Sequence, residues 1–291
     1  MTAGAASWRL RDRVVALDRP IVVGILNVTP DSFSDGGRFV SVGDAVAHAS
    51  RLVAEGADAI DVGGESTRPQ GAVRVDADEE IRRVLPVVGR LRAAHPSLVL
   101  SVDTTKRDVA AAALDAGADA VNDVSGFRLD AGMASMCAEA RCGVVLMHSR
   151  GGVSEMGTYA HASYGDDAVG EMLDELRRRV LAAREAGIDP GRIVVDPGIG
   201  FAKRSEHSLA ALARLPELAS WGHPVMVGVS RKRFIGEITG VTNAAERVHG
   251  TVGANVAALL LGARLFRVHD VAASRRALDV AWAVMRAGGP T

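Results

Sequence analysis

The sequence lacks the features that direct a chain to a membrane, to nucleic acid or to a disulfide-stabilised fold. Its 291 residues include two cysteines and 4% aromatic residues, and the formal net charge is only −1. No apolar run is long enough to span a bilayer, and no signal peptide with a small-residue cleavage site is recognisable. We therefore expect a cytoplasmic protein that binds neither nucleic acid nor a membrane.

The two cysteines give no strong functional signal. Cys137 and Cys142 stand five residues apart, where a predicted helix passes into a strand. This spacing suits a redox pair, but two buried and reduced thiols are the simpler interpretation. The hydrophobic content of 48% is enough to bury a full core, and abundant alanine favours helices packed closely around a sheet.

Short apolar runs recur along the chain and predict buried strands. The segment Trp8–Leu17 alternates apolar with charged residues, which predicts a short hairpin or a plug strand, within an N-terminal extension over residues 1–18. Residues 19–291 form the predicted main domain. Its strands are expected at Ile21–Leu26, Ala59–Val62, Leu98–Val102, Ala120–Val121, Gly143–Met147, Ile193–Val195, Val225–Gly228 and Leu265–Phe266.

Amphipathic stretches follow these strands and predict helices, several of which end at a glycine. They are Gly43–Glu55, Asp76–Ala94, Arg107–Ala116, Asp130–Ala140, Asp166–Ala186, Glu206–Leu218, Ala244–Leu261 and Val271–Arg286. Eight strand-then-helix units in a chain of this length indicate an α/β fold of the (β/α)8 TIM-barrel type. A doubly wound open sheet is the alternative, but it would concentrate polar strand ends at one switch point.

Polar side chains instead stand at the ends of nearly all the strands. In a TIM barrel these ends open onto one face, where active sites lie. Each residue alone could be a strand cap or a surface ion pair. Together they suit a site that holds an anion at one place and a hydrogen-bonding ring at another. The set is Asn27, Asp61, Thr67, Arg68, Asp103, Asn122, Asp123, His148, Asp196, Lys232, Arg267 and His269.

The motifs around these residues resemble those of dihydropteroate synthase, the pterin-binding barrel enzyme of folate synthesis and the target of sulfonamides. The similarity extends from about Ile21 to Val271. The motifs are G-I-L-N-V-T-P-D-S-F-S-D-G-G (24–37), D-V-G-G-E-S-T-R-P (61–69), S-V-D-T (101–104), N-D-V-S-G (122–126), M-H-S-R-G (147–151), D-P-G-I-G-F-A-K (196–203), S-R-K-R-F-I-G (230–236) and R-V-H-D (267–270).

The resemblance implies a reaction and a quaternary state. A homodimeric transferase would condense 6-hydroxymethyl-7,8-dihydropterin diphosphate with 4-aminobenzoate, giving 7,8-dihydropteroate and diphosphate. Mg²⁺ would be the cofactor, with Asn27 as a metal ligand. Asp103, Lys232 and Asn27 would be the catalytic residues.

The resemblance also implies which residues bind the substrates. The pterin pocket would contain Asp103, Asn122, Val124, Met147, Asp196, Phe201, Gly228 and Lys232. The diphosphate and the aminobenzoate would be held by Thr67, Arg68, Arg267, His269, Ser230 and Arg233. The loops Thr29–Gly37 and Thr67–Val75 would close over the site.

The sequence departs from the family pattern at Gln70, an apparent insertion in the loop expected to shape the aminobenzoate pocket. The resemblance implies that discrimination in that pocket, including against sulfonamides, would be affected by Gln70. Two other functions compete with the synthase. A methyltransferase acting on methyl-folate with a corrinoid partner would share the pterin residues but would not need Asn27, Arg267 and His269. A catalytically silent, pterin-binding paralogue would be expected to carry broken motifs, and the motifs here are intact.

Overall fold

The computed structural model describes residues 7–29, 41–65 and 75–288. Most of the two loops predicted at 29–37 and 67–75 therefore lies outside the described residues, as do Thr67, Arg68 and Gln70. None of the described helices is both long and apolar enough to cross a membrane.

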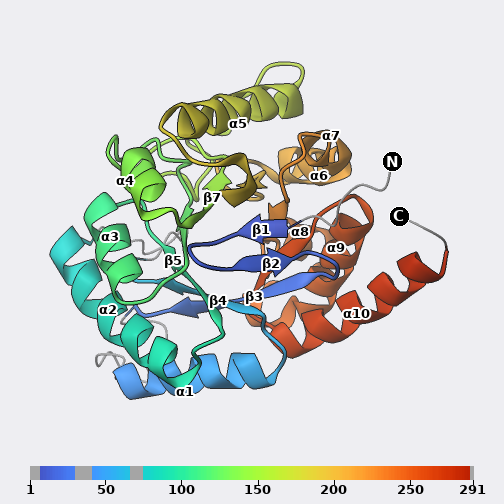
Figure 1. Ribbon diagram of the computed structural model, residues 1–291. Helices are drawn as coiled ribbons and strands as arrows, with labels where there is room; N and C mark the ends of the chain where they lie inside the picture. The colour runs from blue at the N-terminus through green and yellow to red at the C-terminus, as the bar shows by residue number, and fades with distance from the viewer. Residues whose placement is uncertain (1–6, 30–40, 66–74, 289–291) are drawn as a thin grey trace.

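Eight parallel strands form the central sheet, in the order β8-β7-β6-β5-β4-β3-β10-β9. A backbone bridge between Val195 and Val225 joins the two ends of this order, so the sheet is nearly closed into a barrel (Figure 1). The (β/α)8 prediction is thus confirmed. The strands are β3 Ile21–Asn27, β4 Ala59–Gly63, β5 Val99–Asp103, β6 Ala120–Asp123, β7 Gly143–Met147, β8 Ile193–Asp196, β9 Met226–Val227 and β10 Leu265–Val268.

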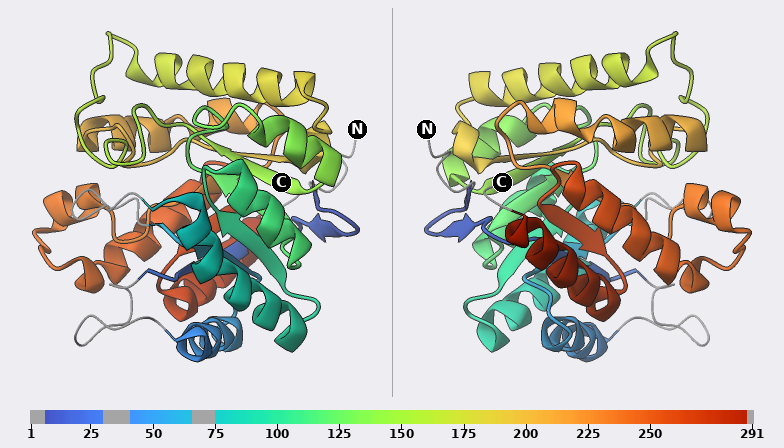
Figure 2. Two further views of the ribbon diagram at one scale, coloured as in Figure 1. Left: turned by 90° about the vertical axis from the view of Figure 1, so that its left-hand side faces the viewer. Right: turned by 90° about the vertical axis from the view of Figure 1, so that its right-hand side faces the viewer.

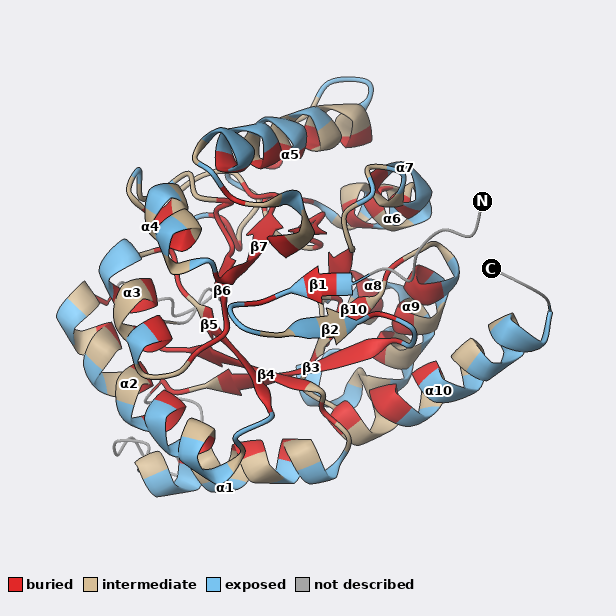
Figure 3. Ribbon diagram, in the orientation of Figure 1, coloured by how far each residue is buried: buried red, intermediate tan, exposed pale blue. Residues whose placement is uncertain are grey.

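Helices surround the barrel and bury one side against it, as the side views and the burial colouring show (Figures 2 and 3). The side chains of Ser41 and Asp76 cap the first two helices by accepting backbone N–H bonds. The helices are α1 Val42–Ala54, α2 Ala77–Ala94, α3 Arg107–Asp115, α4 Met133–Ala140, α5 Ala168–Glu185, α6 Ser205–Ala213, α7 Leu215–Ala219, α8 Arg233–Thr239, α9 Val248–Leu260 and α10 Val271–Ala287, with short 3-10 turns at Pro190–Arg192 and Ala244–Glu246.

Three predicted helices differ from those observed. The helix predicted over Glu206–Leu218 is divided into α6 and α7, because Pro216 stands in the first turn of α7 and cannot continue a helical hydrogen-bond ladder. The helix predicted from Asp130 begins three residues later, at Met133. The stretch predicted as one helix from Ala244 is a 3-10 turn followed by α9, and α8 precedes it as a separate helix.

The N-terminal hairpin closes the barrel at the end where the strands begin. Strands β1 Ser7–Arg9 and β2 Val14–Ala16 pair antiparallel, which confirms the predicted hairpin. Its residues Trp8 and Leu10 are buried in one cluster with the inward-facing residues near the starts of the strands. The Trp8 indole N–H donates to the carbonyl oxygen of Arg192 at 2.9 Å. A domain boundary after residue 18 stays a prediction.

Candidate active site

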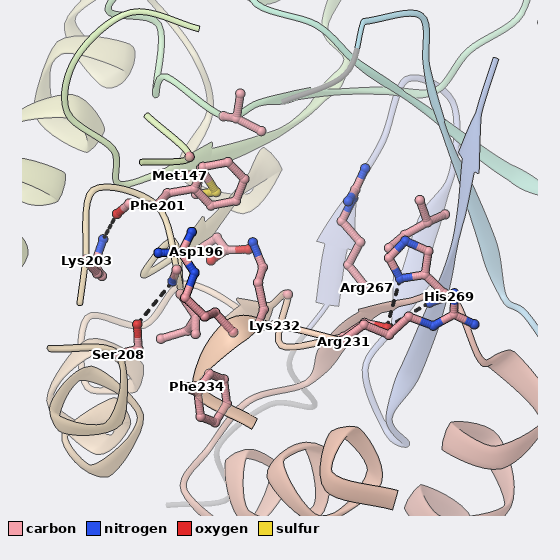
Figure 4. Close-up of a pocket in the computed structure, with 18 of the residues that line it drawn as sticks. Met147, Asp196, Phe201, Lys203, Ser208, Arg231, Lys232, Phe234, Arg267 and His269 are labelled. Carbon is pink, nitrogen blue, oxygen red and sulfur yellow. Dashed lines mark hydrogen bonds between the residues drawn. The ribbon is translucent and has the colours of Figure 1, made fainter. Parts of the chain in front are cut away.

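A cavity of about 770 Å³ opens at the C-terminal ends of the strands, the face where TIM-barrel sites lie. Figure 4 shows its two sides, with Met147, Asp196 and Phe201 on one and Arg267 and His269 on the other. The described residues to which the family resemblance gave a substrate, metal or catalytic role all line this cavity, namely Asn27, Asp103, Asn122, Val124, Met147, Asp196, Phe201, Gly228, Ser230, Lys232, Arg233, Arg267 and His269.

An arginine between two aspartates forms the centre of the site. Arg267 Nε donates to Asp61 Oδ2 at 2.6 Å, and its Nη2 donates to Asp103 Oδ2 at 2.7 Å. Asp61 also accepts from Ser101 Oγ at 2.5 Å and from Asn122 Nδ2 at 2.8 Å. These bonds fix the Arg267 guanidinium and leave the Asn122 amide oxygen as the acceptor available to a ligand.

The charges of this centre are strongly perturbed. Burial raises the pKa of Asp103 to about 7, although the Arg267 charge opposes the rise. Burial alone would lower the pKa of Arg267, but Asp61 and Asp103 outweigh it and raise that pKa. Arg267 is therefore a fixed cation, whereas Asp103 exchanges its proton near neutral pH, as expected of a carboxyl group in an active site.

The part of the cavity around Asp196 and the Phe201 ring, called the slot below, contains a second buried carboxyl group. Asp196 Oδ1 accepts from the Gly198 N–H at 2.7 Å, and burial raises the pKa of Asp196 to about 6. The Lys232 ammonium lies 3.9 Å from the centre of the Phe201 ring, and burial lowers the Lys232 pKa to about 8. Val124, Met147 and Phe201 line the slot and pack in one apolar cluster with Val153 and Met156.

The opposite side of the cavity carries groups that suit an oxyanion. Ser230 Oγ lies 3.0 Å from His269 Nδ1 and accepts from the His269 backbone N–H at 3.1 Å. Arg231 is held by Asp270 through bonds of 2.6 and 3.0 Å, which ties the loop after β9 to the end of β10. Guanidinium, hydroxyl and imidazole groups thus converge opposite the slot.

The match to known proteins decides the family. The pterin binding enzyme family matches residues 23–269. The chain belongs to this family. It is 48% identical over 272 residues to the dihydropteroate synthase of Mycobacterium leprae, covering 92% of this chain and 94% of that one. It is likewise 42% identical over 272 residues to the Bacillus subtilis dihydropteroate synthase, covering 94% and 91%. Within the pterin-binding enzymes it is therefore a dihydropteroate synthase relative over nearly its whole length.

Solved structures agree with this assignment. A Xanthomonas albilineans dihydropteroate synthase with 4-aminobenzoic acid has a TM-score of 0.89 and 48% identity, covering 97% of this chain and 98% of that chain. A structure of the same organism's synthase with 7,8-dihydropteroate has a TM-score of 0.86 and 46% identity, covering 96% and 98%. A Yersinia pestis synthase in complex with a sulfonamide drug has a TM-score of 0.88 and 38% identity, covering 96% and 99%.

Three other residues of the predicted strand-end set do not line the cavity. Asp61 is 1% exposed and lies beneath Arg267 and Asn122. Asp123 is buried and accepts from the Ser125 backbone and hydroxyl at 2.7 and 2.6 Å. His148 is buried behind the cavity wall. Side chains alternate direction along a strand, so when Asn122 and Met147 point into the barrel their neighbours Asp123 and His148 point out.

Other residues at the cavity were missed by sequence reasoning. Glu65 and Lys203 line it and belong to the motifs that carried the family resemblance, so the motifs themselves held the signal. Tyr159 also lines it, but its segment carries no recognisable pattern. Two further basic groups are held by acidic partners: Lys106 pairs with Glu65 and Glu80, and Arg150 pairs with acidic residues of α5.

Proposed function

We propose that the chain catalyses the dihydropteroate synthase reaction, the condensation of 6-hydroxymethyl-7,8-dihydropterin diphosphate with 4-aminobenzoate. The observation that carries this proposal is one cavity with a buried carboxyl group and an aromatic ring on one side and converging cationic and hydroxyl groups on the other. Solved relatives that hold 4-aminobenzoic acid or 7,8-dihydropteroate support the choice of substrates.

In this proposal the slot binds the pterin. An ionised Asp196 would accept two hydrogen bonds from the aminopyrimidine N–H groups. The Asn122 amide oxygen would accept a third, since its Nδ2 already donates to Asp61. Lys232 would donate to the ring carbonyl or nitrogen, while Met147 and Phe201 would pack against the ring. Because Asp196, Asn122 and Lys232 would each bind a different edge of the ring, they would favour one orientation of it.

The bond that breaks joins the pterin methylene carbon to the diphosphate oxygen, and the bond that forms joins that carbon to the aminobenzoate nitrogen. The electron pair of the broken bond leaves with the diphosphate, and the amine gives up a proton. Arg267, His269 and Ser230 would stabilise the departing charge, and Asp103 would stabilise positive charge on the pterin. The protein supplies positioning and electrostatics, with no covalent nucleophile.

We also propose Mg²⁺ as the cofactor. Among the described residues no group of three or more His, Cys, Asp or Glu side chains could hold a metal ion. Asn27 offers one amide oxygen at the cavity, which suits an ion that keeps several waters and is held mainly by substrate phosphates. When bound, the ion would neutralise charge on the diphosphate.

The aminobenzoate is the least defined substrate. Thr67 and Arg68 lie outside the described residues, and their roles stay predictions. Ser230 and Arg233 line the cavity around the start of α8, where backbone N–H groups favour a carboxylate. The roles proposed for the residues around the diphosphate and the aminobenzoate therefore rest on their position and chemistry.

A homodimer and a cytoplasmic location complete the proposal. The exposed apolar side chains Leu260, Val280 and Val284 lie on α9 and α10, two helices that pack on each other. A dimer through these helices would cover apolar surface away from the cavity. Sedimentation or light scattering of the purified protein would measure this state, and a monomer would contradict it.

An activity assay tests the function. Purified protein with Mg²⁺ and both substrates should yield dihydropteroate and diphosphate in equal amounts. Product formation should be lost on chelation of the metal and in Asp103→Ala. Binding of pterin without any product would support the silent paralogue instead. The corrinoid methyltransferase is disfavoured because Asn27, Arg267 and His269 line the same cavity as the pterin groups.

A further inference from the structure

Lys203 is a buried charge at the cavity that the reaction described above does not use. It is 2% exposed and is one of the largest fully buried side chains. The chain has only three lysines among its 34 basic residues. In a chain that uses arginine almost everywhere, a lysine at this buried position suggests that a compact ammonium group is needed there.

The three hydrogen bonds of this ammonium group go to one imidazole nitrogen and two backbone carbonyl oxygens. Lys203 Nζ lies 2.7 Å from His148 Nδ1, 3.0 Å from the carbonyl oxygen of Phe201 and 3.4 Å from that of His148. Figure 4 draws the bond from Lys203 toward Phe201. Lys203 thereby joins the loop after β8 to the end of β7.

The imidazole is fixed from its other side by α5. Because His148 Nδ1 accepts from Lys203, its proton lies on Nε2, which is 3.1 Å from Glu175 Oε2. Burial, followed by the Lys203 charge, lowers the His148 pKa to about 3, so this imidazole is neutral. Arg150 in turn binds Glu175 at 2.6 Å. The acceptor for Lys203 is therefore held in one orientation.

The loop that Lys203 holds has a demanding backbone. Gly198, Gly200 and Ala202 have φ angles of 66°, 76° and 47°, all in the left-handed region. A side chain at Gly198 would collide with the backbone oxygen of His148. This loop carries Phe201, the aromatic wall of the slot, and starts directly after Asp196. Lys203 holds this loop by two contacts to His148 outside it and by one to the Phe201 carbonyl within it.

We propose that Lys203 is a positioning residue: it ties the Phe201 loop to β7 so that the pterin slot is formed before the pterin arrives, and its positive charge favours the ionised form of Asp196. This inference rests on the proposed binding of a pterin in the slot. The role is structural and electrostatic, because the N–H groups of Lys203 are already used within the protein.

The charged groups around Lys203 set the expected pH effect. They are Asp196, Glu175, Arg150 and Lys232, with neutral His148 in direct contact. Lys203 is one of the cations that oppose the rise of the Asp196 pKa caused by burial. Burial lowers the pKa of Lys203 itself to about 7, so Lys203 carries its charge in the range below that pH where Asp196 titrates. Removing its charge should therefore raise the Asp196 pKa further, and pterin affinity should begin to fall at a higher pH.

The test compares Lys203→Met, Lys203→Arg and the control Arg204→Met by titrating each protein with the pterin product analogue pteroic acid between pH 5 and 8. Arg204 is the next residue on the same loop and is exposed. Arg204→Met therefore removes one positive charge, as Lys203→Met does, but breaks no buried contact. We expect Lys203→Met to weaken binding about tenfold or more. It should also raise the pH below which binding weakens, called the acid limb, by roughly half to one pH unit.

Lys203→Arg separates the two parts of the role. It keeps the charge, so the acid limb should stay in place, but its planar guanidinium cannot reproduce the three contacts and binding should still weaken severalfold. Arg204→Met should match the parent in both measurements. Unchanged affinity in a folded Lys203→Met protein would overturn the inference. If that protein does not fold, unchanged affinity in Lys203→Arg would do so. A parent that binds no pteroic acid would instead contradict the proposed function.

Discussion

The two ends of the barrel use burial in opposite ways. At the end where the strands begin, Trp8 and Leu10 of the hairpin pack against apolar residues such as Val99, and the indole N–H has a carbonyl partner. At the other end the same strands bury carboxyl groups beside a cavity. Strand β5 shows both behaviours within five residues, from Val99 to Asp103.

The difference shows where the fold gains stability and where it gives stability up. Burying apolar area at the hairpin end stabilises the folded chain. Burial of Asp196 raises its pKa from 3.8 to about 6. A carboxyl group with a raised folded-state pKa contributes stability that is fully present below its unfolded pKa and is lost as the pH rises through about 6. At neutral pH the ionised Asp196 is therefore a cost, on the order of 2–3 kcal/mol.

Removing the central cation should produce the largest change at the cavity end. Arg267→Ala is expected to raise KM for the pterin diphosphate about 100-fold, because a charge-assisted bond to the leaving group is lost and two buried aspartates lose their partner. Its KM for aminobenzoate should change far less. Steady-state kinetics with each substrate varied in turn gives both values. Equal effects on the two substrates would argue against the phosphate role.

A matched control lies at the other end of the same strand. Arg264 precedes β10, and its guanidinium bonds to the carbonyl oxygen of Ala263 at 2.9 Å and stacks over Trp282. Arg264→Ala should leave both KM values within about twofold of the parent, since it removes packing without touching the cavity.

Removing the hairpin's anchor should affect stability alone. Trp8 is 3% exposed, and Trp8→Ala is expected to lower the free energy of unfolding by about 3–5 kcal/mol. Pterin affinity of the folded protein should not change. Denaturant unfolding and pterin titration measure the two quantities. Val14→Ala, on the exposed side of the same hairpin, should stay within about 0.5 kcal/mol. A large loss of affinity in Trp8→Ala would show that the two ends are coupled.

The pH dependence of binding should reflect the cavity end. Because pterin binding needs the ionised form of Asp196, affinity should fall by up to about tenfold for each pH unit below pH 6. Titrations across pH 5 to 8 would show this limb. Affinity that stays constant over the whole range would mean that Asp196 is not the acceptor.

The smallest effect is expected at an exposed ion pair of the hairpin. Arg9 and Asp189 lie 2.9 Å apart, with 46% and 44% of their side chains exposed. Arg9→Ala should change the free energy of unfolding by less than about 1 kcal/mol, because water screens the pair. A loss above about 2 kcal/mol would contradict this and would show that the exposed ion pair helps to anchor the hairpin.

Much of the fold could be predicted from the sequence because each strand is a short apolar run followed by an amphipathic helix. The strand Gly143–Met147 was predicted with the bounds that the structure has. Prediction was wrong where a local residue interrupts the pattern, as Pro216 does between α6 and α7. A strand as short as β9, with only Met226 and Val227, cannot be bounded from periodicity.

The sequence predicted which strand ends carry the site. It predicted less well the direction in which each side chain points. Asp61 stands two residues before the end of β4, so it lies deeper in the barrel than the cavity. Asp123 and His148 each follow an inward-facing residue and therefore point away. The role of Lys203 was out of reach because its partners, His148 and Glu175, are brought to it only by the fold.

The most direct test of this account measures stability and pterin binding on one preparation of Asp196→Asn. The substitution removes a buried charge but keeps an oxygen that can accept from Gly198. At pH 7.5 we expect a higher unfolding midpoint than in the parent and no pterin binding at concentrations that saturate the parent. A lower midpoint together with unchanged pterin affinity would contradict the central claim, that the carboxyl groups of the cavity give up stability for binding.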